Sequence, residues 1–167
     1  MIERLRDVSR VDRVRRNHAL EHAAITIITE RHPDVLLRGR SNSKGFFIFG
    51  TVETAELRSA VEEALARMRG GEVELAIHPR CGTNLAVAGI LSGLSAAAAS
   101  NLRPRQNRWG YAILAAIGAL MLAPRVGFEM QRHITTLADL GDLRVTRVQR
   151  RRWIIPRDPV HFVSTES

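Results

Sequence analysis

Three ionisable residues close together in an apolar run raise the first chemical question about this chain. The stretch RRNHALEHAAITIITE contains His18, Glu21 and His22 among mostly apolar neighbours. On an α-helix each residue advances about 100°, so the two histidines lie about 40° apart, one turn from each other, and Glu21 falls on the same arc. Because an unpaired buried carboxylate or imidazolium is costly, these groups need partners inside the fold.

A divalent metal ion would be such a partner. Histidines at i and i+4 can both reach a tetrahedral Zn²⁺, which leaves the glutamate between them to act as general base toward water. The stretch HPRCGTN offers His78 and Cys81 at the end of an expected strand. His78 ranks first, because a strand-end histidine followed by proline is rigidly placed, and Cys81 second, since a bound metal deprotonates a thiol. We therefore expect zinc on His18, His22 and either His78 or Cys81, with Glu21 as catalytic base.

Two other interpretations of these residues stay open. The histidines and the glutamate could form a buried hydrogen-bond network that ties the helix to the rest of the fold. Alternatively, Cys81 could be the nucleophile of a cysteine hydrolase, with His78 or His22 as its base. Beyond Gly82, however, the sequence shows no oxyanion-hole signature next to this cysteine.

The elements that position these residues predict a small α+β unit. Residues 9–31 are expected to form one helix, with Ser9 and Asp12 as a capping pair. VLLRGRSNSKGFFIFGTV is typical of two strands joined by a turn. Residues 53–69 carry apolar positions at the period of an amphipathic helix, and 73–79 is expected to be a short strand.

Two uncharged runs follow, at 83–102 and at 109–124. Each is about as long as a helix that crosses a thin hydrocarbon core. Small residues recur every fourth position, at Gly89, Gly93 and Ala97 and at Ala115, Ala119 and Ala123. We predict a transmembrane helical hairpin over 83–127, with Thr83 and Asn84 capping its first helix. A helical hairpin buried in a soluble core is the alternative, but a chain this short could hardly cover it.

The C-terminal part is expected to return to the first unit. Residues 128–143 indicate an amphipathic helix or a turn-rich segment, and RVTRVQRRRWIIP alternates like a strand that could join the earlier sheet. The chain is thus divided into a cytoplasmic α+β unit at 1–82, the hairpin at 83–127 and a C-terminal segment at 128–167. Three further histidines are expected in solvent: His32, His133 and His161.

The charge distribution favours a membrane protein over a nucleic-acid-binding one. The chain carries 25 basic and 17 acidic residues, a net charge of +8. Arginines are denser in the outer flanks of the two apolar runs than between them, which places both termini in the cytoplasm and the hairpin in the inner membrane. The RRR cluster at 150–152 would meet anionic lipid. Aromatic residues make up only 5% of the chain, so a base-stacking platform, and with it nucleic-acid binding, is not expected.

NHALEHA, GFFIFGTV, HPRCGTNLAV and the paired apolar runs together resemble a group of uncharacterised bacterial membrane proteins that share a domain of unknown function. The resemblance covers about residues 15–145. It implies a two-span membrane protein with a His/Glu motif, and it implies no activity. Separately, the H-x-x-E-H spacing resembles the inverzincin metallopeptidases. That resemblance implies a third ligand from a glutamate on another helix, here Glu62 or Glu63.

The function that these observations favour is a membrane-anchored zinc metallohydrolase of the peptidase type. The edge of KGFFIFGTV could hold an extended peptide by strand addition. The alternative is a non-enzymatic membrane subunit or assembly factor of a larger membrane complex, in which the His/Glu group is structural. The expected partners are membrane lipids, a peptide substrate or a partner membrane protein, and further copies of the chain.

Overall fold

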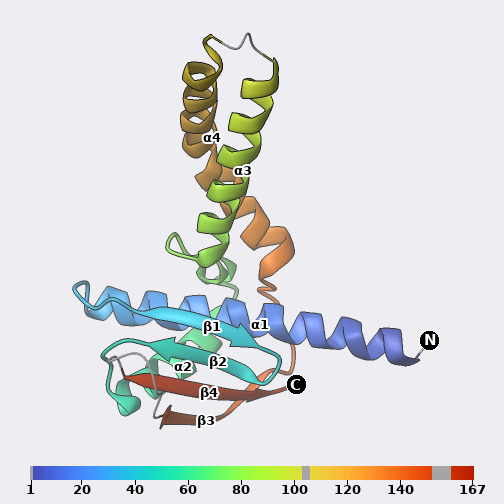
Figure 1. The fold of residues 1–167 in the computed structure, drawn as a ribbon. Coiled ribbons are helices and arrows are strands. Elements are labelled where there is room, and N and C mark those ends of the chain that lie inside the picture. Colours follow the sequence, from blue (N-terminus) through green and yellow to red (C-terminus); the bar gives the residue numbers. More distant parts are fainter. Residues whose placement is uncertain (1, 103–105, 152–158) are drawn as a thin grey trace. The chain divides into compact units, whose positions relative to one another are not determined.

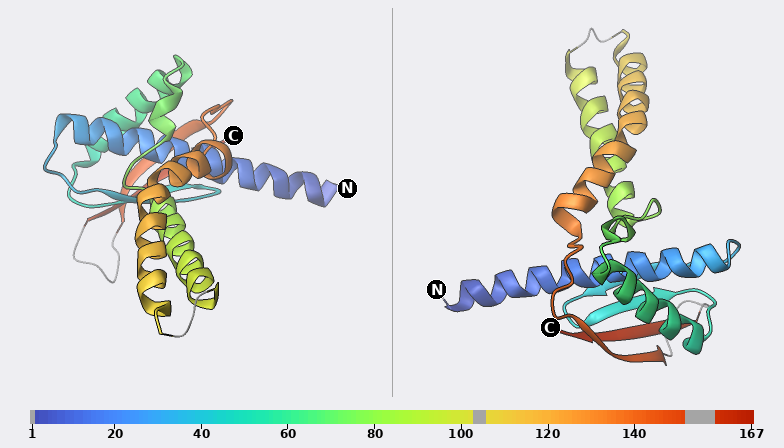
Figure 2. Two further views of the ribbon diagram at one scale, coloured as in Figure 1. Left: turned by 90° about the horizontal axis from the view of Figure 1, so that it is seen from above. Right: turned by 180° about the vertical axis from the view of Figure 1, so that it is seen from behind.

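The computed structural model describes residues 2–102, 106–151 and 159–167. Helices and a sheet occur together, so the α+β class is confirmed. The chain separates into two compact units. The first combines Met1–His78 with Arg132–Ser167, and the second is Pro79–Gln131. Figures 1 and 2 show the elements of both units.

The long helix α1 runs over Ile2–Arg31 and provides one side of the core of the first unit. It begins seven residues before Ser9, so the predicted start was wrong. The preceding residues include Glu, Arg and Leu, which are good helix formers and need no break at a serine. Its apolar side is fully buried, with at most 1% of each side chain exposed at Leu20, Ala23, Ala24, Ile27 and Ile28.

Four antiparallel strands form a sheet of order β1-β2-β4-β3. They are β1 (Arg38–Asn42), β2 (Gly45–Phe49), β3 (Arg144–Arg151) and β4 (Val160–Glu166). The predicted hairpin is confirmed as β1 and β2, and β3 lies where a C-terminal strand was expected, although the end of that prediction (152–156) falls outside the described residues. Strand β4, through which β3 joins the sheet, was not predicted from the sequence.

The helix α2 covers Thr54–Arg69, as predicted, and buries one apolar side. The segment after it is a 3₁₀-helix, η1 (Val73–Ala76), so the prediction of a strand at 73–79 was wrong. Its backbone bonds are local: the amide of Leu75 donates to the carbonyl of Glu72, and that of Ile77 to Glu74. Alternating apolar residues form a strand only where a neighbouring strand can take up their hydrogen bonds.

The two faces of the sheet differ, because residues paired across antiparallel strands point to the same side. The inner face packs on α1 and α2 through Phe46, Ile48, Val148 and Val163. His161 lies opposite Ile48 and is 1% exposed, so the prediction that it is solvated was wrong. It occupies an inner position of the strand that the sequence analysis missed. His32 and His133 are exposed, as predicted.

The second unit is a pair of helices, α3 (Gly82–Leu102) and α4 (Arg108–Met130). Both are long and apolar enough to cross a membrane. Small residues on α4 are buried at Ala112, Ala119 and Ala123. The second helix continues three residues past the predicted end and is followed by a π-helix, η2 (Gln131–Thr135). Of the predicted segment at 128–143, the part from 136 onward is not helical.

The start of α3 differs from the prediction that Thr83 and Asn84 cap it. Both residues already lie inside its first turn. The amide of Thr83 donates to Sγ of Cys81 at 3.4 Å, and the Asn84 side chain donates to the carbonyl of Pro79 at 2.8 Å. The Asn84 amide oxygen also accepts a 2.8 Å bond from Gln131. Cys81 therefore occupies the capping position that the sequence analysis assigned to Thr83 and Asn84.

Candidate metal centre

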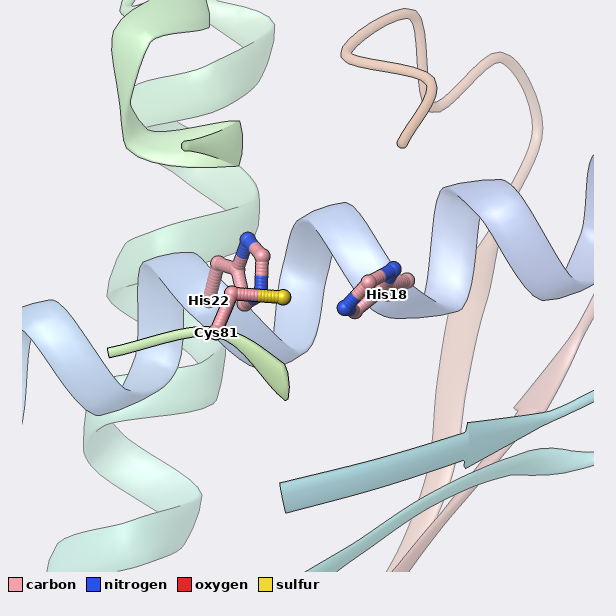
Figure 3. A group of neighbouring side chains, drawn as sticks. All are labelled: His18, His22 and Cys81. Atoms are coloured by element: carbon pink, nitrogen blue, oxygen red, sulfur yellow. The ribbon is translucent and has the colours of Figure 1, made fainter. Parts of the chain in front are cut away.

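The first unit brings the two histidines of α1 together as their spacing predicts. The ring centroids of His18 and His22 are 4.3 Å apart, and one ligating atom of each lies within 4.8 Å of the other. Figure 3 shows both rings on the same side of α1, one turn apart. His22 is only 2% exposed, and His18 is half-buried. The third side chain in the figure, Cys81, belongs to the second unit.

Backbone carbonyls orient both imidazole rings. Nδ1 of His18 lies 2.9 Å from the carbonyl oxygen of Thr135, and Nδ1 of His22 lies 2.7 Å from that of Ala76. A carbonyl oxygen only accepts, so Nδ1 donates in both rings and the lone pair of the neutral imidazole is on Nε2. Metal-binding histidines commonly donate their second ring nitrogen to a carbonyl in this way. The two rings are therefore held in the tautomer that would present Nε2 to a metal ion.

A third imidazole approaches from the segment after α2. The ring centroid of His78 is 5.7 Å from that of His22, with an angle of 39° between the planes. The 3₁₀-helix accounts for this position: Ala76, which ends it, accepts the bond from His22, and His78 follows two residues later. The strand predicted here does not exist, yet the histidine lies beside α1. His22 therefore has two neighbouring imidazoles in the first unit, those of His18 and His78.

The carboxylate of Glu21 is held against strand β1. Glu21 is 4% exposed, and the Ser41 hydroxyl donates to its Oε2 at 2.6 Å. A Cβ atom built on Gly39 would overlap Oε1 of Glu21, so a larger residue at this position would displace the Glu21 side chain. Neither Ser41 nor Gly39 was predicted to lie at this centre. The one available signal was a glycine inside a strand, which often marks a close approach of another group.

The two glutamates of α2 that the inverzincin resemblance offers as third ligands, Glu62 and Glu63, are not brought to the histidines. The Glu63 carboxylate pairs with Arg31 at the end of α1 and accepts a 3.5 Å bond from Arg67. Arg31 lies nine residues beyond His22, which is about 13 Å along a helix. Glu62 is exposed. The inverzincin pattern of a third ligand from a second helix is therefore not the arrangement of the first unit.

A cavity of about 310 Å³ lies one turn further along α1 than His22. Thr26 lines it and donates through its hydroxyl to the carbonyl of His22 at 2.9 Å. A hydrogen bond from Arg67 lowers the pKa of the Glu72 carboxyl in its wall, so this wall stays negatively charged at neutral pH. The lining residues are Thr26, Gly71, Glu72, Val73, Glu74, Leu75 and Ile77.

Comparison with known proteins places the chain in a family. Residues 13–148, which include all the residues discussed at this centre, match the family described as Domain of unknown function (DUF6391). An uncharacterized protein of Picosynechococcus sp. is 39% identical over 140 residues, covering 77% of this chain and 68% of that protein. No solved structure matches the chain. The chain therefore belongs to the DUF6391 family.

Proposed function

We propose that this protein is a membrane-anchored zinc metallohydrolase of the peptidase type, whose metal is held by α1. The observation that carries the proposal is that two other imidazoles, those of His18 and His78, lie beside His22, although His78 comes from a segment far away in the chain. In two of these rings, Nδ1–H donates a hydrogen bond to a backbone carbonyl. Nitrogen ligands with such support are what Zn²⁺ favours in proteins.

Cys81 decides which kind of zinc site forms. Only two residues separate it from His78, so the chain between them spans about 10 Å at most. Three histidines with an open fourth position are typical of catalytic zinc, whereas four protein ligands are typical of structural zinc. With His78 as the third ligand, zinc and activity should survive Cys81→Ser and be lost in His78→Ala, and with Cys81 as the third ligand the reverse is expected. Loss of zinc in both variants would indicate four protein ligands and a structural site.

Glu21 is the candidate general base. It lies between the two histidines on α1, and Ser41 and Gly39 restrict its side chain. When bound, zinc would supply a Lewis acid that polarises a carbonyl group and activates water. Glu21 would accept the proton of the attacking water, and Ser41 would keep the carboxylate in one orientation. The neighbouring cavity, with Glu72 and Glu74 in its wall, would take a side chain of the peptide substrate.

Elemental analysis of detergent-purified protein tests the metal. We expect about one zinc per chain in the wild type, and loss of zinc in His22→Ala because a buried ligand is removed. His133→Ala is the matched control, since His133 is exposed and should leave the zinc content unchanged. A wild-type protein that takes up no zinc even after incubation with ZnCl₂ would refute the metal site and with it the hydrolase.

Hydrolysis of labelled casein tests the base. We expect Glu21→Gln to lower the rate by about 100-fold or more, because the amide cannot accept a proton, while zinc stays bound. Glu63→Gln on α2 is the control, because Glu63 lies in surface ion pairs and should leave the rate unchanged. Full activity in Glu21→Gln would rule out this role of Glu21 without affecting the metal site.

The membrane part of the proposal rests on the two apolar helices of the second unit. We place the hairpin in the inner membrane with both termini in the cytoplasm, because arginine is denser in its outer flanks than in its connecting loop. Alkaline phosphatase fused to either terminus should then be inactive, and fused into the loop it should be active. An active terminal fusion would contradict this orientation.

A second candidate function is a subunit or assembly factor of a membrane complex. The bond between Ser41 and Glu21 favours it, because a carboxylate held against the sheet can be purely structural. A Cβ built on Gly89 or Gly93 of α3 would meet nothing within 4 Å, so small residues there remain open to a partner helix. A stoichiometric partner that co-purifies with zinc-free protein would support this function over the hydrolase.

A further inference from the structure

The cavity beside α1 and η1 has a mainly apolar lining. Leu75 is 8% exposed, and Thr26 and Ile77 are half-buried. Val73, in contrast, is 50% exposed, so the lining reaches the surface of the first unit. A Cβ atom built on Gly71 would meet nothing within 4 Å, so there is open space beside this glycine. The first unit therefore contains a cavity of about 310 Å³ that is apolar inside and accessible from its surface.

The two carboxylates in the cavity wall are already paired with arginines. Oε2 of Glu72 accepts a 2.7 Å bond from Arg67. Oε2 of Glu74 lies 3.3 Å from a guanidinium nitrogen of Arg132. A basic side chain of a ligand would have to compete with these arginines for the same oxygens, whereas an apolar side chain needs only to displace water from the apolar lining. The ligand chemistry that the cavity favours is therefore apolar rather than basic.

The cavity lies close to the candidate metal centre. Thr26 follows His22 by four residues, which is about 6 Å along α1, and its hydroxyl donates to the His22 carbonyl at 2.9 Å. On the side of η1, Leu75 lines the cavity, and the next residue, Ala76, accepts the 2.7 Å bond from Nδ1 of His22. An extended peptide advances about 3.3 Å per residue. A side chain in the cavity would therefore lie about two residues along a peptide from the His22 ring.

We propose that this cavity is the specificity pocket of the hydrolase, and that it selects peptides with a large aliphatic or aromatic side chain within about two residues of the bond that is cut. The inference rests on the proposed function, because cutting the bond needs the metal on His22. The volume is at the lower end of the range for pockets that bind small organic ligands, so it suits one side chain. A charged side chain would lose its hydration between Leu75 and Ile77 without gaining a partner.

Binding of fluorescein-labelled hexapeptides to the full chain in detergent tests this selectivity without hydrolysis. EDTA is present, and the peptides consist of serine and glutamine with one variable residue. We expect the phenylalanine peptide to bind about tenfold more tightly than the lysine or the aspartate peptide, because only its side chain matches the apolar lining. Fluorescence anisotropy is the readout.

The substitution Val73→Asp tests whether the cavity is the source of the selectivity. Aspartate at this exposed position would bring a charge against the bound apolar side chain, so the affinity for the phenylalanine peptide should fall about tenfold. Val11→Asp is the matched control, because Val11 is 58% exposed and lies about 22 Å along α1 from Thr26. Its affinity should equal that of the wild type. Circular dichroism checks that both variants fold, and partitioning of the peptide into detergent affects both equally.

Mapping of the bonds that the zinc-loaded protein cuts in casein tests the same selectivity during hydrolysis. We expect a large apolar residue within about two positions of most cut bonds, and a weaker preference in Val73→Asp. The zinc content and the rate on casein test the hydrolase, whereas the peptide affinities and the residues beside the cut bonds test the pocket. The two proposals can therefore fail separately.

Two results would overturn the pocket and leave the hydrolase intact. The first is equal affinity for the three peptides together with cut bonds that show no side-chain preference. The second is tighter binding of the lysine peptide, which would assign the cavity to basic side chains through Glu72 and Glu74. Conversely, a chain that takes up no zinc but binds the phenylalanine peptide, with loss of affinity in Val73→Asp, would refute the hydrolase and keep the cavity as a peptide-binding site.

Discussion

The helices α1 and α3 use polar and apolar side chains in opposite ways. On α1 the polar residues Asn17, Glu21 and His22 are at most 4% exposed. On α3 the apolar residues Leu85 and Leu94 are 78% and 65% exposed. A helix of a water-soluble domain is expected to bury its apolar side and expose its polar one. Each helix departs from this rule, and the two departures have different physical causes.

The buried polar groups of α1 have specific partners within the first unit. The Asn17 amide donates to the carbonyl of Asn42 at 2.8 Å and accepts from the Thr165 hydroxyl at 2.7 Å. Glu21 accepts from Ser41, and His22 donates to a backbone carbonyl. Buried polar groups with complete hydrogen bonding specify one arrangement of the elements around them. The first unit is therefore organised by directional contacts that each depend on a few atoms.

The exposed apolar groups of α3 require no particular partner atom, only surroundings that are not water. Exposed apolar surface of this extent is rare on monomeric proteins in water, and it marks an interface with a partner or a membrane. The comparison therefore predicts that small substitutions at the hydrogen-bonded positions lower the stability of the first unit. In the second unit, a charge anywhere along the outer surface should impair membrane insertion, whereas a change in side-chain shape should have little effect.

The largest expected effect comes from a charge on α3. Leu94 lies near the middle of α3, so Leu94→Arg should disfavour insertion by about 2.5–3.5 kcal/mol if the helix crosses a bilayer. The measurement is the fraction of protein that stays in the membrane pellet after an alkaline wash, together with an insertion assay on the isolated hairpin sequence placed in a host protein.

Leu36→Arg is the matched control for this charge. Leu36 is 73% exposed, slightly more than Leu94, but lies in the first unit just before β1. Its replacement should change stability by no more than about 0.5 kcal/mol and leave the membrane fraction unchanged. Equal tolerance of arginine at both positions would show that α3 faces water, and the comparison between the two helices would fail.

A methyl group at Gly39 should have the next largest effect. The added Cβ would overlap the Glu21 carboxylate, which is buried and bonded to Ser41, so the side chain cannot move aside without breaking this bond. We expect Gly39→Ala to lower the free energy of unfolding of the first unit by about 1–3 kcal/mol. Urea denaturation and hydrogen exchange in residues 38–49 would measure it.

Gly89→Ala on α3 is the corresponding change in the second unit. A Cβ there meets nothing within 4 Å, and alanine is the better helix former by about 1 kcal/mol. The variant should therefore be neutral or more stable. If Gly39→Ala were as harmless as Gly89→Ala, the packing of Glu21 against β1 would not be a constraint on the fold.

The sequence predicts those elements whose pattern depends on local geometry. The turn residues between β1 and β2 and the apolar period of α2 identify their elements, and helical spacing alone brings His18 next to His22. Two uncharged runs likewise identify α3 and α4. In each case the physical cause lies within a few residues of its effect.

Features that depend on distant segments are not predictable in this way. Strand β4 has a serine and a threonine among its seven residues and no glycine turn beside it, and it owes its position to β2 and β3. The partners of His18 and His22 are backbone carbonyls, which every residue possesses, so no residue type reveals them. The pairing of Glu21 with Ser41 required the register of β1 against α1, which only the folded structure supplies.

The smallest expected effect is a pH dependence at His161, another polar residue buried in the first unit. Burial, and then the positive charge of Arg150, lower the pKa of this imidazole, while Glu53 raises it to a smaller extent. Nε2 lies 2.9 Å from the Thr54 hydroxyl. The folded state therefore favours the neutral ring. Its contribution to stability is complete above the unfolded pKa of about 6.5 and is lost as the pH falls below that value.

Urea denaturation at pH 7.5 and at pH 5.5 measures this loss. We expect the wild type to be less stable at the lower pH, and His161→Gln to reduce the difference, because glutamine does not titrate. His133→Gln is the control, since His133 is exposed and should leave the difference as in the wild type. An unchanged pH dependence in His161→Gln would mean that this ring reaches water when protonated. The contrast between buried polar residues in the first unit and exposed apolar residues in the second would then hold for α1 and not for β4.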